Sequence, residues 1–352
     1  MKTRVINVGS VKIGGGNPVS VQSMLNVPLT DIERALAQIK SLEEAGCEII
    51  RATVPDKACA EALKIIIPEM KTPMVADIHF DYRMAIASAE NGAAKIRINP
   101  GNIGGDDKIK EVCACLKANG IPARIGINGG SVEKDILAKY GKVTAEGLVE
   151  SAARSVEKFE QFGLYDVAVS IKASDVVMTV EANRNFSAKY DNPLHIGITE
   201  AGEGTQGIIW GSVGIGTMLM EGIGDTIRVS LTGGTVEEVI AGREILKACG
   251  LRKEGIHIVS CPTCGRTTTD TLSIIRKIRE KTSKIKKPLT VAVMGCVVNG
   301  PGESSNADIG VACSGGKGVI FKGGKIYKTV PDSLVADILL EEIFEMVKEG
   351  NV

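Results

Sequence analysis

The chain has 352 residues, and its 42 Lys and Arg residues are balanced by 42 Asp and Glu residues. This balance excludes the overall positive field with which many proteins hold nucleic acid or an acidic membrane surface. Because 44% of the residues are hydrophobic and no stretch resembles a signal peptide or a membrane span, we expect a folded cytoplasmic protein.

The first 250 residues alternate between short β-rich runs and longer helical patterns. A strand at 19–24 precedes a helix at 31–45, in which Ile32, Leu36 and Ile39 recur at helical spacing. Seven further strands are expected at 48–54, 74–80, 94–99, 123–128, 166–173, 194–200 and 226–231. Eight strands in this alternation predict a parallel (β/α)8 TIM-type barrel over residues 1–250, although a doubly wound sheet shares the alternation.

After Gly250 the pattern changes, which indicates a second domain over residues 251–352. Strands are expected at 257–261, 289–294, 308–312, 318–321 and 325–329, with helices at 269–281 and 331–347. A smaller α/β domain is therefore expected to follow the barrel.

Three cysteines and one glutamate form the strongest motif of this second domain. Cys261 and Cys264 lie in Cys-Pro-Thr-Cys-Gly-Arg-Thr, and Cys296 precedes Glu303 in Gly-Cys-Val-Val-Asn-Gly-Pro-Gly-Glu. Structural zinc usually takes four Cys or His ligands, whereas a cubane held by three thiolates leaves one iron for a weaker oxygen ligand. The motif favours a catalytic [4Fe–4S] cluster with Glu303 as a displaceable ligand. Zinc, a thiol redox pair and Cys313 as the fourth ligand remain alternatives.

Basic residues share one face of the expected barrel strands. In Lys95-Ile96-Arg97-Ile98-Asn99 the polar residues alternate with isoleucines, which suits helices outside and a polar interior. The same phase brings five cations to one barrel mouth, namely Arg51, Arg97, Arg124, Lys172 and Arg228. Unpaired buried cations are costly, so this group needs carboxylates, such as Asp77 and Glu200, and an anion. Arginine forks suit phosphate oxygens, which predicts a diphosphate or doubly phosphorylated ligand.

Two further residues lie where expected strands end, which is where barrel enzymes carry their sites. His79 follows Ala-Asp-Ile and is a candidate for substrate binding, while Glu200 closes Ile-Gly-Ile-Thr and suits an acid or base. Taken singly, each of these residues, like each strand cation, is also compatible with a structural role.

Seven segments together resemble the bacterial 4-hydroxy-3-methylbut-2-enyl diphosphate synthases of the methylerythritol phosphate route to isoprenoids. They are VQSM, ADIHF, KIRINPGNIG, SIKASDV, HIGITEAG, CPTCGRT and MGCVVNGPGE, and the resemblance spans essentially the whole chain. It implies that 2-C-methyl-D-erythritol 2,4-cyclodiphosphate is reductively opened and dehydrated to the linear hydroxymethylbutenyl diphosphate. It also implies reduced flavodoxin or ferredoxin as electron donor, and a head-to-tail homodimer in which one cluster domain covers the partner's barrel.

The resemblance further implies roles for single residues. The implied cluster ligands are Cys261, Cys264, Cys296 and Glu303. The implied diphosphate cradle is Arg51, Arg97, Arg124, Lys172, Arg228 and Ser230, with Asn128 beside it. Glu200 resembles a proton-handling carboxylate, and Asn299 lies where a cluster-loop amide can contact substrate. Two alternatives are a phosphate-sugar aldolase or lyase, with Lys172 as Schiff base and structural zinc, and a non-enzymatic iron–sulfur carrier.

Overall fold

A computed structural model of the chain describes residues 2–298 and 300–349. The chain divides into two compact units, and the division falls between Arg252 and Lys253. Each unit has its own apolar core.

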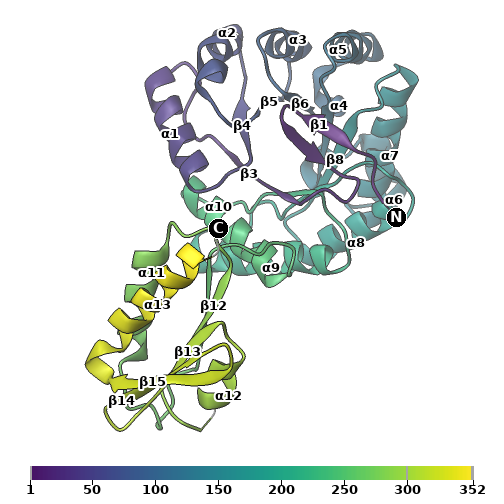
Figure 1. The fold of residues 1–352 in the computed structure, drawn as a ribbon. Helices are drawn as coiled ribbons and strands as arrows, with labels where there is room; N and C mark the ends of the chain where they lie inside the picture. The colour runs from purple at the N-terminus through teal and green to yellow at the C-terminus, as the bar shows by residue number, and fades with distance from the viewer. Residues whose placement is uncertain (1, 299, 350–352) are drawn as a thin grey trace. The chain divides into compact units, whose positions relative to one another are not determined.

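Eight parallel strands of the first unit form a barrel in the order in which they follow along the chain (Figure 1). They are β3 (Ser20–Met24), β4 (Ile49–Thr53), β5 (Met74–Ile78), β6 (Lys95–Ile98), β7 (Ala123–Asn128), β8 (Val167–Lys172), β9 (His195–Ile196) and β10 (Thr226–Ile227). A parallel bridge between Val169 and Leu194 closes the ring between β8 and β9. The predicted barrel is confirmed, and an open doubly wound sheet is excluded. The last two strands are shorter than expected, because ladder pairing covers two residues of each.

Helices surround the barrel and cover the outward-facing side chains of its strands. They are α1 (Ile32–Glu44), α2 (Lys57–Ile66), α3 (Tyr82–Glu90), α4 (Pro100–Ile103), α5 (Asp106–Ala118), α6 (Lys134–Tyr140), α7 (Ala145–Gln161), α8 (Val176–Ser187), α9 (Gly204–Met220) and α10 (Thr235–Ala248). Aspartates cap several of these helices, as Asp31 does for α1 by accepting the backbone N–H of Arg34. The buried stripe of α1, formed by Ala35, Ile39 and Leu42, belongs to the main core.

A short hairpin closes the amino-terminal end of the barrel. Its strands, β1 (Ile6–Val8) and β2 (Val11–Ile13), pair in antiparallel register. The hairpin residues Ile6, Val8 and Ile13 pack against Ile49, Val75 and Ala168, which lie near the beginnings of three barrel strands. The hairpin was not expected from the sequence, because three-residue strands are too short to show periodicity. The barrel site must therefore open at the opposite, carboxyl-terminal end.

The second unit is a five-stranded mixed sheet covered on both faces. Its strands lie in chain order, namely β11 (Ile256–Ser260), β12 (Leu289–Met294), β13 (Ile309–Ser314), β14 (Lys317–Lys322) and β15 (Lys325–Pro331). The first three are parallel and the last two antiparallel. Helices α11 (Thr271–Thr282) and α13 (Val335–Glu349) pack on one face, and the unpredicted α12 (Gly300–Ser305) packs on β12 and β13 (Figure 1). The expected smaller α/β fold is confirmed.

Candidate functional site

Polar side chains fill the barrel interior, where many barrels carry apolar layers. The buried polar residues on its strands include Gln22, Asp77, Lys95, Arg97, Arg124, Lys172 and His195. The residues that alternate with them, such as Ile96, Ile98 and Ile125, belong to the core shared with the helices. The expected phase, with isoleucines outward and cations inward, is therefore present.

Asp77 pairs with two of the five predicted cations. Its carboxylate lies 3.1 Å from Arg97 Nη1 and 3.6 Å from Arg51 Nε, and its side chain is 2% exposed. Burial alone raises the pKa of Asp77, but the charges of Arg51 and Arg97 outweigh it and hold this pKa below its usual value. The pKa of Arg51 is lowered to about 10, because burial and the charges of Arg228 and Arg97 together outweigh the opposing charge of Asp77.

Arg228 pairs with Glu238 of α10, a partner that was not predicted from the sequence. The contact is bidentate, with Arg228 Nε and Nη2 donating to the two carboxylate oxygens over 3.0 and 2.9 Å. Glu238 also accepts from Ser23 Oγ and from the backbone N–H of Leu231. Among the ion pairs of the described residues, this neutralising role falls to Glu238 and not to Glu200. No local pattern marks Glu238, because a residue on a helix carries no strand periodicity.

Arg124 and Lys172 form no ion pair within the described part of the chain. Arg124 is 1% exposed and donates from Nη1 to Gln22 Oε1 over 3.0 Å. Burial, followed by the charges of Arg51 and Arg97, holds the pKa of Arg124 well below its usual value. Burial, followed by the charge of Arg124, does the same to the pKa of Lys172. The interior thus holds more positive groups than its carboxylates can balance, which is the electrostatic condition for binding an anion.

Two inward glycines give the long cationic side chains room to cross the barrel. A Cβ at Gly197 would lie 2.7 Å from Lys172 Nζ and 2.4 Å from the backbone oxygen of Arg228. A Cβ at Gly126 would lie 2.6 Å from Arg97 Nε. Any larger residue at these positions would displace a cation or the backbone.

A cavity of about 520 Å³ opens at the carboxyl-terminal ends of the barrel strands. Four predicted site residues line it, namely His79, Arg97, Asn128 and Glu200. His79 Nε2 lies 3.6 Å from Asp77, and Glu200 has a left-handed backbone with φ of 55°. Ser230 follows β10 and is half-buried outside this lining, and Asn299 lies outside the described residues.

Two of the predicted cluster ligands, Cys261 and Cys296, follow neighbouring strands of the second unit. Strands β11 and β12 are parallel neighbours with Ser260 opposite Val293, so the loops carrying Cys261 and Cys296 leave the sheet side by side. The backbone N–H of Gly295 donates to Cys261 Sγ over 3.3 Å. Cys264 is exposed in the first loop, and Glu303 is exposed on α12, the short helix after the second loop.

The predicted ligands are three thiols and one carboxylate, a donor set open to both a zinc ion and an iron–sulfur cluster. No three His, Cys, Asp or Glu side chains of the described residues lie close enough to share one metal ion. Each cysteine of a cubane binds a different iron, so cluster ligands stand farther apart than the ligands of one zinc ion. Cys313 packs in the apolar core beneath α13, and burial raises the pKa of its thiol to about 11.

Comparisons with known proteins place the chain in a family. Residues 3–243 match the GcpE TIM-barrel domain, and residues 257–345 match the GcpE protein C-terminal domain. The chain belongs to the GcpE family. A relative from Caldanaerobacter subterraneus is 57% identical over 99% of this chain and 98% of its own length, and one from Aquifex aeolicus is 53% identical over 99% and 98%. Both are named 4-hydroxy-3-methylbut-2-en-1-yl diphosphate synthase (flavodoxin).

Membership of the GcpE family confirms the predicted resemblance and the predicted enzyme class, an oxidoreductase. It does not support the alternatives of a phosphate-sugar aldolase or lyase and a non-enzymatic iron–sulfur carrier. Among solved structures, dihydropteroate synthase from Yersinia pestis matches 70% of this chain and 97% of its own, with a TM-score of 0.51 and 12% identity. That likeness shows the barrel fold alone. No helix in the described ranges is both long and apolar enough to cross a lipid bilayer.

Proposed function

We propose that the chain catalyses the reductive ring opening of 2-C-methyl-D-erythritol 2,4-cyclodiphosphate to (E)-4-hydroxy-3-methylbut-2-enyl diphosphate. Two electrons and two protons enter the reaction and one water leaves, so the step balances. The supporting observation is the surplus of buried cations in the barrel interior, in a chain whose full-length relatives carry the corresponding name.

The barrel holds the diphosphate. The proposed cradle is Arg51, Arg97, Arg124, Lys172, Arg228 and Ser230, with Asn128 and His79 at the cavity wall. Asp77 and Glu238 hold three of these arginines in place before the ligand arrives, so little reorganisation accompanies binding. The glycines at 126 and 197 keep the cationic side chains in that arrangement.

Glu200 handles protons at the mouth. Its side chain is exposed and lines the cavity, within reach of a ligand whose phosphates lie deeper. A protonated Glu200 can deliver a proton to the oxygen that leaves as water. Asn299 is proposed to contact the substrate from the cluster loop, at a position outside the described residues.

Cys261, Cys264, Cys296 and Glu303 are the residues proposed to hold a [4Fe–4S] cluster. When bound, the cluster supplies electrons one at a time. The N–H of Gly295 stabilises negative charge on Cys261, as hydrogen bonds to cluster sulfurs do in general. Reduced flavodoxin or ferredoxin is the proposed donor, and the relatives' printed name supports flavodoxin. The proposed location is the cytoplasm, where such a donor is available.

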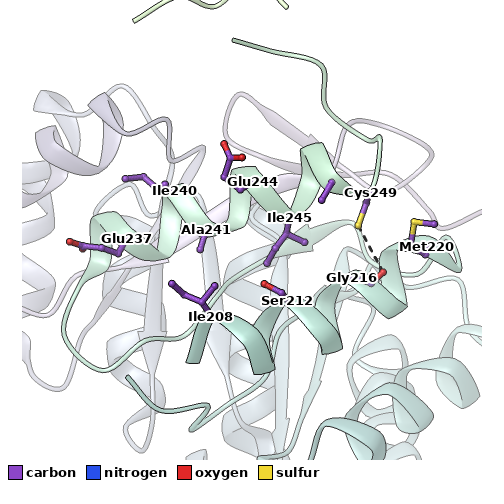
Figure 2. A pocket seen from close by; sticks show the side chains of 11 residues that line it. Ile208, Ser212, Gly216, Met220, Glu237, Ile240, Ala241, Glu244, Ile245 and Cys249 are labelled. Carbon is purple, nitrogen blue, oxygen red and sulfur yellow. Dashed lines mark hydrogen bonds between the residues drawn. The ribbon is translucent and has the colours of Figure 1, made fainter. Parts of the chain in front are cut away.

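We further propose a homodimer, assembled head to tail so that each cluster domain serves the partner's barrel. Helix α9 carries no charged residue over Gly204–Met220, and such a helix is ordinarily buried on all sides. Yet Ile209, Trp210 and Val213 of this helix are exposed. Beside them, an apolar groove of about 580 Å³ lies between α9 and α10, with Ile208 and Ile245 directed into it (Figure 2). A second copy is the proposed cover for this face.

Oxygen-free purification with iron and sulfide analysis tests the proposal directly. We expect about four irons and four sulfides per chain, and turnover of the cyclodiphosphate with reduced flavodoxin. Cys296→Ala should lose both the iron and the turnover, whereas Arg124→Ala should keep the iron and bind the diphosphate far more weakly. Stoichiometric zinc with negligible iron, or full turnover by either variant, would contradict the assignment.

A further inference from the structure

Helix α11, which follows the first cysteine loop, and the turn after it carry a dense positive charge. Residues 276–287 contain seven Lys and Arg and a single acid, Glu280, although the whole chain has 42 of each sign. Lys277 pairs with Asp337 of α13 over 2.6 Å, and Lys281 lies 3.8 Å from Glu280. The other exposed cations of this segment form no ion pair with any described residue, namely Arg276, Arg279, Lys284 and Lys286.

The needs of the helix itself do not explain this composition. Exposed cations on the barrel helices pair with an acid three residues away in Arg34–Asp31 and Lys64–Glu61. No acid lies three or four residues from Arg279, whose neighbour at that spacing is Arg276, and like charges so placed repel. A cation in the last turn complements the helix dipole, which accounts for Arg279. Arg276 lies in the middle of α11, where the dipole gives it no such role.

Three exposed residues form one outward ridge of α11. Leu272, Arg276 and Arg279 recur at i, i+4 and i+7, which places them on one face of the helix. The opposite face is buried in the core of the second unit through Ile274, Ile275 and Ile278. We call the outward residues the docking ridge. It joins one exposed apolar side chain to two unpaired guanidinium groups.

The docking ridge begins beside both cysteine loops. Helix α11 starts at Thr271, seven residues after Cys264, and Leu272 belongs to its first turn. A Cβ at Gly295, the residue before Cys296, would lie 3.1 Å from Thr271 Cγ2, so the second loop meets the same end of the helix. At 1.5 Å per residue, the ridge extends about 12 Å along the helix from Thr271.

We propose that the docking ridge, extended by Lys284 and Lys286, is the surface on which the electron donor binds, and that this donor is a flavodoxin with an acidic face. The inference rests on the proposed function, in which electrons must reach the cysteine loops. Electron-transfer partners form small, short-lived contacts that opposite charges steer together. An apolar residue nearest the loops, followed by arginines, suits such a contact because Arg is enriched at binding hot spots.

Two other occupants explain less. A single-stranded nucleic acid would also be attracted by the cations, but residues 271–287 contain no aromatic side chain on which a base could stack. A second copy of the chain is better served by the exposed apolar face of α9, which carries no charged residue. An acidic protein surface needs only the positive charge and the small apolar contact that the docking ridge offers.

Charge reversal on the docking ridge tests the proposal. In the full chain, purified without oxygen, the double substitution Arg276→Glu with Arg279→Glu should raise the Kd for a bacterial flavodoxin, measured by calorimetry, at least tenfold. The difference should be large at an ionic strength of about 0.01 M and should shrink at about 0.15 M. Lys110→Glu with Lys189→Glu is the matched control, because it changes the net charge equally at exposed barrel positions. Its Kd should stay within about twofold of wild type.

Kinetics separate docking from chemistry. The KM for reduced flavodoxin should rise in the ridge variant, while turnover driven by dithionite, a small reductant that needs no docking surface, should be unchanged. Arg276→Lys with Arg279→Lys keeps the charge and should keep most of the flavodoxin affinity.

Three results would overturn the proposal. One is an unchanged Kd for flavodoxin in the charge-reversed variant, including the case in which retention on immobilised nucleic acid is lost instead. Another is a shift of that variant to monomer in sedimentation, which would assign the docking ridge to the contact between copies. The third is a loss of dithionite-driven turnover. Failure of the proposed function is distinguishable, because wild type would then turn over no cyclodiphosphate with either reductant while the two variants still differed in flavodoxin binding.

Discussion

Arg97 and Asp77 lie directly opposite each other on neighbouring strands, with Arg97 Nη1 3.1 Å from Asp77 Oδ1 inside the barrel. Arg51 approaches the other oxygen of the same carboxylate to 3.6 Å. A single buried carboxylate therefore positions two arginines, while the cations around them outnumber their counter-charges. This arrangement keeps the positive groups fixed and available for an anion.

Removing the Asp77 charge should destabilise the barrel. In Asp77→Asn the guanidinium groups of Arg51 and Arg97 lose their buried counter-charge, so the free energy of unfolding at pH 7 should fall by about 3 kcal/mol. Urea denaturation measures the change, and pyrophosphate should restore part of it. The control is Asp81→Asn, whose partner Arg83 is exposed and whose effect should stay within about 0.5 kcal/mol. Equal losses in the two variants would rule out the buried pairing.

The Asp77→Asn substitution should also change how the free energy of unfolding depends on pH. The pKa of Asp77 is lower in the folded state than the unfolded value of about 3.9, so the unfolded chain binds the extra proton. Its stabilising contribution is complete above the unfolded pKa and is lost as pH falls through the folded pKa. Between pH 5 and pH 3, about the range in which acids of this kind titrate, wild-type stability should fall more steeply than that of Asp77→Asn.

Substitution at Gly197 should displace side chains of the proposed diphosphate cradle without adding or removing a charged residue. Gly197→Ala places a methyl group 2.7 Å from Lys172 Nζ and 2.4 Å from the Arg228 backbone oxygen. We expect pyrophosphate affinity, measured by calorimetry, to fall about tenfold, which corresponds to about 1.4 kcal/mol. Gly105→Ala is the control, because a Cβ at Gly105 would meet no atom within 4 Å and its φ is −68°. Unchanged affinity in Gly197→Ala would show that Lys172 does not need this space.

Glu200 should show a trade-off between stability and activity. It is the one described non-glycine residue with a positive φ, and its carboxylate lines the mouth cavity. Glu200→Gly should raise the free energy of unfolding by about 0.5–1 kcal/mol, after allowance for the larger chain entropy of glycine in the unfolded state. The turnover of this variant should fall about 100-fold. Glu200→Gln should lose a similar amount of turnover with no gain in Tm. A Glu200→Gly protein with full turnover would exclude the proton-handling role.

Substitutions of two cysteines of the second unit should have different effects on iron content. Cys313 is buried and Cys261 is half-buried. Cys313→Ala removes a core thiol that packs in the same cluster as Val335, so it should lower stability by about 1 kcal/mol and leave the iron content per chain unchanged. Cys261→Ala should abolish iron binding, because Cys261 lies in the ligand loop beside Gly295. Iron loss in Cys313→Ala would make Cys313 a ligand and displace Glu303 from that role.

The exposed apolar face of α9 should control assembly. Trp210→Glu introduces a charge into the face that the second copy is proposed to cover, so sedimentation should shift from dimer to monomer. Tyr165→Glu provides the matched control, since Tyr165 is an exposed aromatic residue of the same unit away from α9. Persistence of the dimer in Trp210→Glu would place the interface elsewhere.

Local sequence patterns determined the βα alternation, the inward phase of the cations and the spacing of the cysteine loops. Each is a short-range signal, because a strand alternates between two faces and a loop ligand lies next to its strand. Segments without such periodicity, such as the three-residue strands of the hairpin and the short α12, could not be predicted for the same reason.

Tertiary structure alone decided which charges meet. Arg228 pairs with Glu238 on a following helix, Lys95 Nζ and His195 Nε2 have no hydrogen-bond partner among the described residues, and α9 exposes Ile209, Trp210 and Val213. These outcomes depend on how distant segments pack, since the free energy of a buried charge is set by its three-dimensional neighbours and not by its position in a repeat.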